Sequence, residues 1–390
     1  MRFHLPTLLR FGSGVVAGLK EIVEKDLGVS RAFLVTDEGI RKAGLVERVL
    51  DVLPDIEVFE KIEPNPRHST VNKAGDIVRS LSPEIIIGLG GGSVLDAAKA
   101  VALLAANPGK IEDYEGRSKY KSPPLPVLAI PTTCGTGSEV TWVSVITHTE
   151  RKFKMSIKGP EMFPAAALVD PDLLASLPPV LVASTGMDAI VHAIEAYTVK
   201  PATFITDIFA LEAAQILFSF LEAGYKDIKN DNSAREGLMK GSMLAGIAFG
   251  NSDVGAVHCI SESIGALFDV PHGVANSIFL PYVMEFNLQV SAARYAEIAR
   301  MTGIDEKNDH EAGLGLIKKI KDLSHALNIP VLKDLGIEES YFQDIAQKSF
   351  QNNSNSSNPR KAGIEDYMGI LKRAYDANQG APTCNFRTGH

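Results

Sequence analysis

The sequence predicts an α/β domain with a buried, mostly parallel sheet, followed by a domain built almost entirely from helices. In the first half of the chain, short apolar runs alternate with helical patterns, which is typical of parallel strands joined by helices. From about Ser184 onward, long helical patterns dominate and strand patterns nearly vanish. The chain has 390 residues, more than one hydrophobic core usually serves, so its length also suits two domains.

The strand candidates of the first domain are three apolar runs separated by helical segments. They are AFLVTD (32–37), EIIIGLG (84–90) and LPVLAIPTT (125–133). The second domain is expected to contain the helices GMDAIVHAIEAYTV, DIFALEAAQILFSFLEAG and AREGLMKGSMLAGIAFG. The pair Pro178 and Pro179 lies near the change of pattern, and proline pairs mark breaks. We therefore place the two domains at residues 1–181 and 182–390.

The composition argues against several classes of protein. Lys and Arg number 39 against 47 Asp and Glu, which gives a net charge of -8, so we expect no nucleic-acid partner. The N-terminus lacks the pattern of a signal peptide, and no uninterrupted apolar run is long enough to cross a membrane. Cys134, Cys259 and Cys384 are scattered without a CxxC motif, which argues against a disulfide framework. A cytoplasmic location is therefore expected.

A glycine-rich turn follows the second strand candidate, in EIIIGLGGGSVLDAAK. Glycines without Cβ atoms let a phosphate approach the backbone, and the N-terminus of the following helix favours negative charge. Ser93 is expected to cap this helix, with Asp96 completing a capping box. Ser93 also occupies the third glycine position of an otherwise matched G-x-G-x-x-G pattern. The alternative is a tight turn in a protein that binds no nucleotide.

Two further features favour a Rossmann-like dinucleotide-binding domain. The segment PTTCGTGSE (131–139) follows the third strand candidate and is dense in Gly and Thr, which offer donors to phosphate or ribose. Asp37 ends the first strand candidate, where an acid can accept hydrogen bonds from the adenosine ribose and repel a 2′-phosphate. Taken alone, an acid at this position is more often a turn residue.

A possible metal site lies in the helical domain. Asp188 and His192 are spaced i and i+4, so they face the same side of a helix, and their apolar neighbours indicate a buried face. His258 and His272 supply two more imidazoles, and such a nitrogen and oxygen set suits Fe²⁺, Zn²⁺ or another divalent transition metal. Taken alone, an Asp and a His at this spacing are more often a surface pair, and a buried His more often forms hydrogen bonds within the core than binds a metal. The sequence shows no such clustering for the other histidines, namely His4, His68, His148, His310, His325 and His390.

These motifs together resemble the iron-containing (group III) alcohol dehydrogenases, whose superfamily also holds glycerol dehydrogenase and dehydroquinate synthase. The resemblance covers nearly the whole chain through PTLLRFGSG, PNP, GLGGGSVLDAAK, PTTCGTGSEVT, GMDAIVHAIEAY, LAGIAF, PHGVAN and NPR. It implies a Rossmann-like N-terminal domain, an all-helical C-terminal domain and an active site in the cleft between them. It also implies an NAD-dependent, metal-dependent enzyme that interconverts a small primary alcohol or diol and its aldehyde, in a homodimer or larger homo-oligomer.

The resemblance assigns roles to individual residues. The implied ligands of Fe²⁺, or of Zn²⁺ or another divalent metal, are Asp188, His192, His258 and His272. The implied NAD-binding residues are Asn65, Gly91, Gly92, Ser93, Thr132, Thr133 and Lys154. Asp37 matches the position that separates NAD users from NADP users, and an acid there favours NAD.

Glu262 is the clearest departure from the family pattern. Relatives usually carry a second histidine four residues after the one that matches His258, and here that position is Glu262. Three roles are open for its side chain: a proton relay, a group that holds a metal ligand or a water, or a substrate-pocket group that selects polar or cationic substrates. The fourth possibility is a side chain turned into solvent or a structural salt bridge.

Two other functions remain to be distinguished. A lyase similar to dehydroquinate synthase needs basic residues for a phosphorylated substrate, but Lys and Arg are scarce around the motifs here. A non-catalytic nucleotide-binding sensor would be expected to lose some metal ligands, but the chain retains all four candidates.

Overall fold

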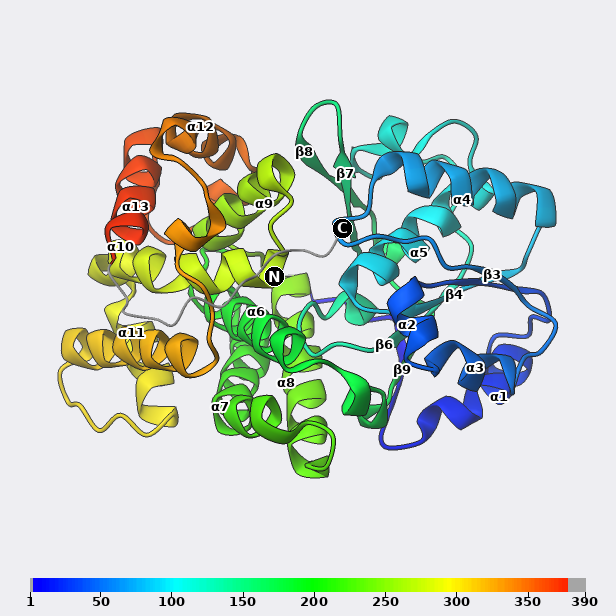
Figure 1. Cartoon of the computed structure of the whole chain (residues 1–390), viewed down its shortest axis with the longest axis horizontal. Coiled ribbons are helices and arrows are strands. Elements are labelled where there is room, and N and C mark those ends of the chain that lie inside the picture. The colour runs from blue at the N-terminus through cyan, green and yellow to red at the C-terminus, as the bar shows by residue number, and fades with distance from the viewer. Residues whose placement is uncertain (1–2, 378–390) are drawn as a thin grey trace. The chain divides into compact units, whose positions relative to one another are not determined.

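The computed structural model describes residues 3–377 (Figure 1). Cys384 therefore lies outside the described residues. The chain divides into two compact units, each described here by itself. The first comprises Phe3–Leu177 and Ile228–Met239, and the second comprises Pro178–Asp227 and the residues from Lys240 onward.

The first unit is built on a six-stranded parallel sheet with the strand order β1-β9-β6-β4-β2-β3. Its strands are β1 (Leu8–Phe11), β2 (Ala32–Val35), β3 (Glu57–Phe59), β4 (Ile85–Gly90), β6 (Val127–Pro131) and β9 (Ala166–Val169). The chain adds β3 on one side of β2 and β4 on the other, so the strand order reverses between β2 and β4. Ligands of open α/β sheets bind at such reversals, beyond the carboxyl ends of the strands.

Helices cover both faces of this sheet, because its strands are apolar on both sides. Helices α4 (His68–Leu81) and α5 (Gly92–Ala106) pack in one core cluster together with Ile86. Helices α1 (Leu19–Glu21) and α3 (Leu45–Leu50) pack in the other, together with Ile85 and Ile87. Successive side chains of β4 thus enter opposite cores, as the continuous apolar run predicts.

A smaller sheet, which the sequence analysis does not predict, lies beside this core. It holds β5 (Gly116–Arg117), β8 (Phe153–Lys158) and β7 (Val143–His148), with β7 and β8 forming an antiparallel hairpin. Its polar and apolar residues are mixed, so no continuous apolar run marks the strands in the sequence.

The second unit is helical. Its helices are α6 (Pro179–Thr198), α7 (Phe204–Asp227), α9 (Ala256–Phe268), α10 (His272–Met301), α11 (Asp309–Ala326), α12 (Phe342–Gln351), α13 (Ile364–Asp376) and most of α8 (Asn232–Asn251). Helix α6 is buried along almost all of its length and packs against α7 and α10. The predicted fold class, a parallel α/β domain followed by a helical domain, is confirmed.

Helix α7 is long and apolar enough to cross a membrane when judged by length and composition alone. The mean hydropathy of its qualifying window is 1.6, and 33% of that window is buried. Helices α8 and α9, bent by 101°, pass the same test as a pair. Asp207, Glu212 and Glu222 interrupt the apolar segment of α7, so it is not an uninterrupted apolar run although its mean hydropathy is high. A core helix of a globular protein passes the same test, so the finding is weak evidence for a membrane span.

Candidate metal centre and dinucleotide site

The structure brings together all four predicted metal ligands. Asp188 and His192 lie one turn apart on α6, His258 lies on α9, and His272 begins α10. Single ligand atoms of Asp188, His258 and His272 all lie within 4.8 Å of one another. Nε2 of His192 lies 3.0 Å from Nε2 of His258. One carboxylate and three imidazoles thus converge from three helices.

This centre is buried on every side except that of His272. Asp188 is 2% exposed, and His192 and His258 are each 4% exposed. The side chain of His272 is 27% exposed, so solvent contacts this residue of the centre. Gly273 allows the start of α10 to approach α6 closely, because a Cβ there would lie 2.3 Å from the carbonyl oxygen of Ser184. The PHG turn thereby places the His272 ring beside Asp188.

Glu195 orients His258, and the sequence analysis misses it. Its carboxylate accepts hydrogen bonds from Nδ1 of His258 at 2.6 Å and from the backbone amide of Val257 at 2.8 Å. A carboxylate only accepts, so Nδ1 carries the proton and Nε2 presents a lone pair. The signal in the sequence is the spacing of Asp188, His192 and Glu195 at i, i+4 and i+7, which places all three on one face of α6.

Two more residues that the sequence analysis misses shape this centre. The ring of Phe249 stacks on His192, with centroids 4.3 Å apart. The side-chain amide nitrogen of Asn276 lies 2.5 Å from Oδ1 of Asp188 and 3.2 Å from Nε2 of both His258 and His272. An amide nitrogen carries two protons, whereas three acceptor atoms face it. Such an excess of converging lone pairs fits a divalent cation with nitrogen and oxygen ligands.

The charges of this centre also suit a cation. Burial raises the pKa of Asp188, but the neighbouring His192, His272 and His258 lower it by more, so the net pKa lies below its usual value. Burial lowers the pKa of His258, but the hydrogen bond to Glu195 and the nearby carboxylates raise it above its usual value. Asp188 is therefore an anion at neutral pH.

Glu262 lies one turn after His258 on α9 and is half-buried. Its carboxylate accepts a hydrogen bond of 2.6 Å from the side-chain amide of Asn352. Asn352 also caps the short helix η9 (Asn353–Ser357) by accepting from the backbone amide of Ser354. The Glu262 side chain is thus tied to the polar loop after α12.

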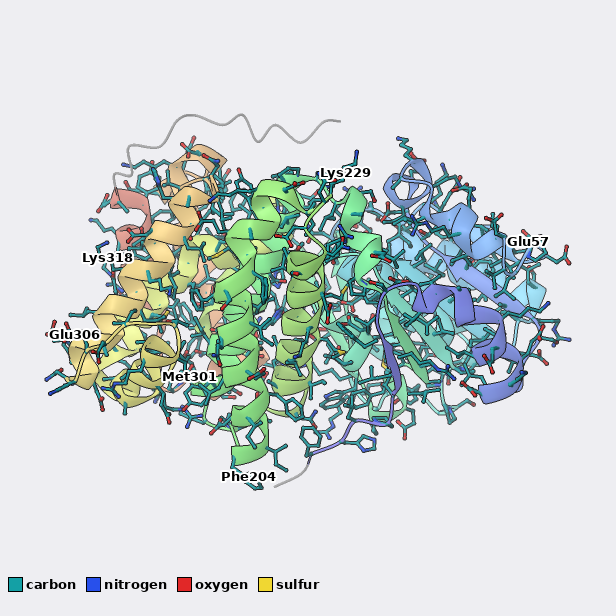
Figure 2. All side chains as sticks on the ribbon, turned by 90° about the horizontal axis from the view of Figure 1, so that it is seen from below. Glu57, Phe204, Lys229, Met301, Glu306 and Lys318 are labelled. Carbon is teal, nitrogen blue, oxygen red and sulfur yellow. The ribbon has the colours of Figure 1, made fainter. Side chains whose placement is uncertain are left out.

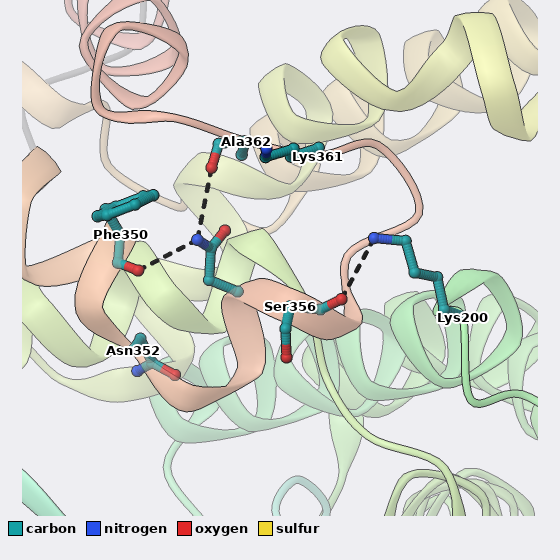
Figure 3. Close-up of a pocket in the computed structure, with 7 residues that line it drawn as sticks. Lys200, Phe350, Asn352, Ser356, Lys361 and Ala362 are labelled. Carbon is teal, nitrogen blue, oxygen red and sulfur yellow. Dashed lines mark hydrogen bonds between the residues drawn. The ribbon is translucent and has the colours of Figure 1, made fainter.

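Asn352 also lines a cavity of about 260 Å³ in the helical unit. The close-up in Figure 3 shows Lys200 donating to the carbonyl of Ser356, and a side-chain amide reaching the carbonyls of Phe350 and Ala362. The predicted metal ligands are not among the residues that line this cavity.

Five of the predicted dinucleotide-binding residues, Gly91, Gly92, Ser93, Thr132 and Thr133, lie at the carboxyl ends of β4 and β6. Gly91 and Gly92 form the turn into α5, and the backbone amide of Thr132 donates to the carbonyl of Gly90 at 3.1 Å. A Cβ on Gly91 would lie 3.0 Å from Thr133, and one on Gly92 would lie 2.4 Å from Thr136. The glycine turn and the PTTCGTGSE loop therefore pack directly against each other, and this packing is a second reason for glycine here.

The predicted capping box at Ser93 is wrong. Gly91 is the N-cap of α5, and Ser93 lies within the first turn of the helix. Asp96 instead accepts hydrogen bonds from the Ser138 hydroxyl at 2.6 Å and from the backbone amide of Val145 at 2.9 Å. These donors lie on the short helix η4 (Ser138–Val140) and on β7, which pack against α5, and the local sequence around Asp96 does not reveal that packing.

Three further predicted residues lie in other segments of the first unit: Asp37 after β2, Asn65 after β3, and Lys154 on β8. Asp37 caps α2 (Glu38–Lys42) by accepting from the backbone amide of Ile40, and burial raises its pKa. Asn65 has a left-handed backbone with φ of 53°, and its side-chain oxygen accepts from Nζ of Lys154 on β8 at 2.8 Å. The structure thus pairs Asn65 with Lys154.

The comparisons with known proteins cover both units. Residues 6–171 match "Iron-containing alcohol dehydrogenase", and residues 182–375 match "Fe-containing alcohol dehydrogenase family, C-terminal". The chain belongs to the iron-containing alcohol dehydrogenase family. This confirms the predicted family and, with it, the predicted class of activity, that of an alcohol dehydrogenase.

Individual members of this family are similar along nearly the whole chain. Alcohol dehydrogenase 4 of Saccharomyces cerevisiae is 37% identical over 96% of this chain and 98% of its own. The NAD-dependent methanol dehydrogenase of Bacillus methanolicus is 36% identical over 95% and 99%. A solved 1,3-propanediol oxidoreductase has a TM-score of 0.91 at 36% identity, covering 96% and 99%. The predicted cofactors, NAD and a divalent metal, agree with these matches and with the converging ligands.

Proposed function

We propose that this protein interconverts a small primary alcohol or diol and its aldehyde, using NAD and a divalent metal, Fe²⁺ or another transition metal such as Zn²⁺. One observation carries the proposal: Asp188, His192, His258 and His272 converge in a buried centre that is open on the His272 side. Methanol and 1,3-propanediol dehydrogenases among the relatives support small alcohols and diols as substrates.

The residues of the centre bind the metal and fix its ligands. Asp188 supplies a negative charge, and Glu195 and Phe249 hold two of the imidazoles in place. When bound, a divalent cation supplies a Lewis acid that lowers the pKa of an alcohol hydroxyl or polarises an aldehyde carbonyl. Burial of the surrounding side chains excludes water and strengthens these electrostatic effects.

The first unit supplies the residues that we propose for NAD. The glycine turn at Gly91 and Gly92 and the N-terminus of α5 provide backbone amides for the diphosphate. Thr132, Thr133 and Ser93 lie at the same edge of the sheet, and the Asn65–Lys154 pair is proposed to contact the cofactor as well. Asp37 is proposed to accept hydrogen bonds from the adenosine ribose and to repel a 2′-phosphate, so NAD is preferred.

We propose that Glu262 is a proton relay for the substrate. Its position one turn from His258 supports this role, whereas its hydrogen bond with Asn352 supports the alternative of a structural contact. Holding a ligand or a water, selecting a polar substrate, and a purely structural contact remain the alternative roles.

The remaining proposals concern location and assembly. We propose a cytoplasmic homodimer or larger homo-oligomer that acts without a nucleic-acid or membrane partner. The net charge of -8 supports the absence of a nucleic-acid partner. The exposed apolar side chains of Phe204 and Ile208 on α7 support an interface between subunits.

Metal analysis followed by an activity panel tests the proposed function. The protein is purified without chelator or oxygen, its metal content is measured, and NADH and NADPH formation is followed with a panel of alcohols and diols. We expect at least one equivalent of divalent metal and NADH formation with small primary alcohols. NAD binding without turnover of any alcohol in the metal-loaded protein would instead favour the sensor. A phosphorylated substrate that is converted without net NADH formation would favour the lyase.

A further inference from the structure

A second group of potential metal ligands lies in the first unit and shares no residue with the centre at Asp188. His68 begins α4, His148 ends β7, and Glu150 lies in the turn of the β7–β8 hairpin. Single ligand atoms of these three residues all lie within 4.8 Å of one another. The sequence analysis finds no clustering for these histidines, because 80 positions separate them and only the fold brings them together.

The potential ligand atoms of this group lie close to one another. His68 Nδ1 lies 3.3 Å from the carbonyl oxygen of Thr147, which only accepts, so Nδ1 carries the proton. Nε2 of His68 is then an acceptor, and it lies 3.2 Å from Oε2 of Glu150. His148 Nδ1 accepts a long hydrogen bond from the backbone amide of Arg151, and it lies 3.0 Å from the same oxygen. Three acceptor atoms therefore meet with no donor hydrogen between them.

A cation resolves this arrangement. The hydrogen bond from the backbone amide of Glu150 lowers the pKa of its carboxyl, so the group is an anion at neutral pH. The two imidazole rings stack with centroids 4.5 Å apart and an angle of 24° between their planes. Protonating both rings would place two positive charges in this stack, whereas one divalent ion accepts lone pairs from all three residues.

We propose that His68, His148 and Glu150 form a second divalent-metal site, of the type that binds Zn²⁺ through two imidazoles and one carboxylate. The side chains of His68 and His148 are 10% and 17% exposed, which gives two fixed, largely desolvated ligands. Glu150 is 71% exposed, so the site opens to solvent and the ion enters without unfolding the unit.

The position of this site connects it to the residues proposed for NAD. The backbone amide of Thr147 donates to the carbonyl of Pro66 at 2.8 Å, which joins β7 to the loop that carries Asn65. Thr147 pairs across the hairpin with Lys154, whose Nζ donates to Asn65. A metal on His68 and His148 ties these same two segments together beside the Asn65–Lys154 pair.

Zinc stoichiometry tests the proposal. Metal-free full-length protein is dialysed against Zn²⁺, and bound zinc per chain is measured for the wild type, Glu150→Gln, His148→Ala and the control His310→Ala. Glu150→Gln keeps the fold because this side chain is exposed, and His310 is an exposed histidine of the other unit. Circular dichroism checks the fold of each variant.

We expect the wild type and His310→Ala to bind one more zinc per chain than either site variant. The difference in bound zinc between the wild type and the site variants decides the result, and not the total zinc per chain, because we expect zinc to bind the centre at Asp188 as well. An equal stoichiometry in the wild type and in any folded site variant overturns the proposal. The readout is independent of enzyme activity, so it does not depend on the proposed function.

Discussion

At the scale of single residues, Glu195 is proposed to position a metal ligand without contacting the metal itself. Its carboxylate fixes the tautomer of His258 through a hydrogen bond of 2.6 Å. We predict that Glu195→Gln lowers metal affinity by about 10- to 100-fold, because such partners orient the ligand and raise its basicity. Metal affinity is measured by competition with a chromophoric chelator. Glu212→Gln, an exposed acid on α7, is the control, and equal affinities in the two variants would contradict the role of Glu195.

Glu262 replaces the histidine that relatives usually carry at this position, so a variant of Glu262 shows whether this difference affects proton transfer. We predict that Glu262→Gln changes the pH dependence of turnover while metal content stays near normal, since the change removes the proposed proton relay but no expected ligand. Turnover is measured from pH 5 to 10 in parallel with metal analysis. Asn352→Ala is the control, because it removes the hydrogen bond of 2.6 Å but keeps the carboxylate. An unchanged pH profile with normal kinetics would exclude both the relay and the substrate-pocket role.

At the scale of elements, the glycine turn depends on the packing of two loops. A Cβ on Gly92 would lie 2.4 Å from Cγ2 of Thr136, so we predict that Gly92→Ala destabilises the protein by about 1–3 kcal/mol and weakens NAD binding at least about tenfold. Chemical unfolding and NAD titration measure the two effects. Gly18→Ala is the control, because a Cβ there meets nothing within 4 Å. Adding Thr136→Gly removes all three clashing atoms, Cγ2, Oγ1 and Cβ, so a double variant no better than Gly92→Ala would refute this explanation.

Two buried ionisable side chains, Lys99 and Glu139, make stability depend on pH. Nζ of Lys99 donates to Ser138 and to the carbonyl of Val143, and burial lowers the pKa of Lys99 to about 8. Burial raises the pKa of Glu139 to about 7, against 4.5 for the free residue. The folded state therefore holds the Glu139 proton more tightly than the unfolded state. Its contribution is complete below pH 4.5 and is lost as the pH rises to about 7.

The variant Glu139→Gln isolates this contribution. Relative to the wild type, we predict that it becomes more stable as the pH rises from 5 to 7, by at most about 1.4 kcal/mol per pH unit for one proton. Above pH 7 the difference should level off. The free energy of unfolding of both proteins is measured by denaturant titration at each pH. A difference that stays constant from pH 5 to 8 would show that Glu139 does not titrate in this range.

At the scale of the whole molecule, the sequence predicts what local pattern encodes. Three apolar runs predict β2, β4 and β6 of the six strands in the large sheet, and the i, i+4 spacing of Asp188 and His192 predicts a shared face that the structure shows. Contacts between distant segments are not encoded in this way. The pairing of His68 with His148, the donors that recruit Asp96, and the amide of Asn276 all depend on which helices and loops meet in the fold. For Glu195, the sequence shows that it shares a helix face with Asp188 and His192, but it does not show that Glu195 binds His258.

The exposed apolar side chains on α7 lead to a testable prediction about how subunits assemble. Phe204 and Ile208 lie one turn apart on α7 and are 66% and 63% exposed, and Figure 2 shows Phe204 at the end of this helix. An exposed pair of this size favours burial against another subunit, because each large apolar side chain gains about 1.5–3 kcal/mol on leaving water. We predict that replacing both with Ser shifts the protein to a smaller assembly, measured by light scattering over a dilution series. Leu81→Ser, an apolar position of α4 that is 43% exposed, is the control. An unchanged mass in the double variant would place the subunit interface on another face.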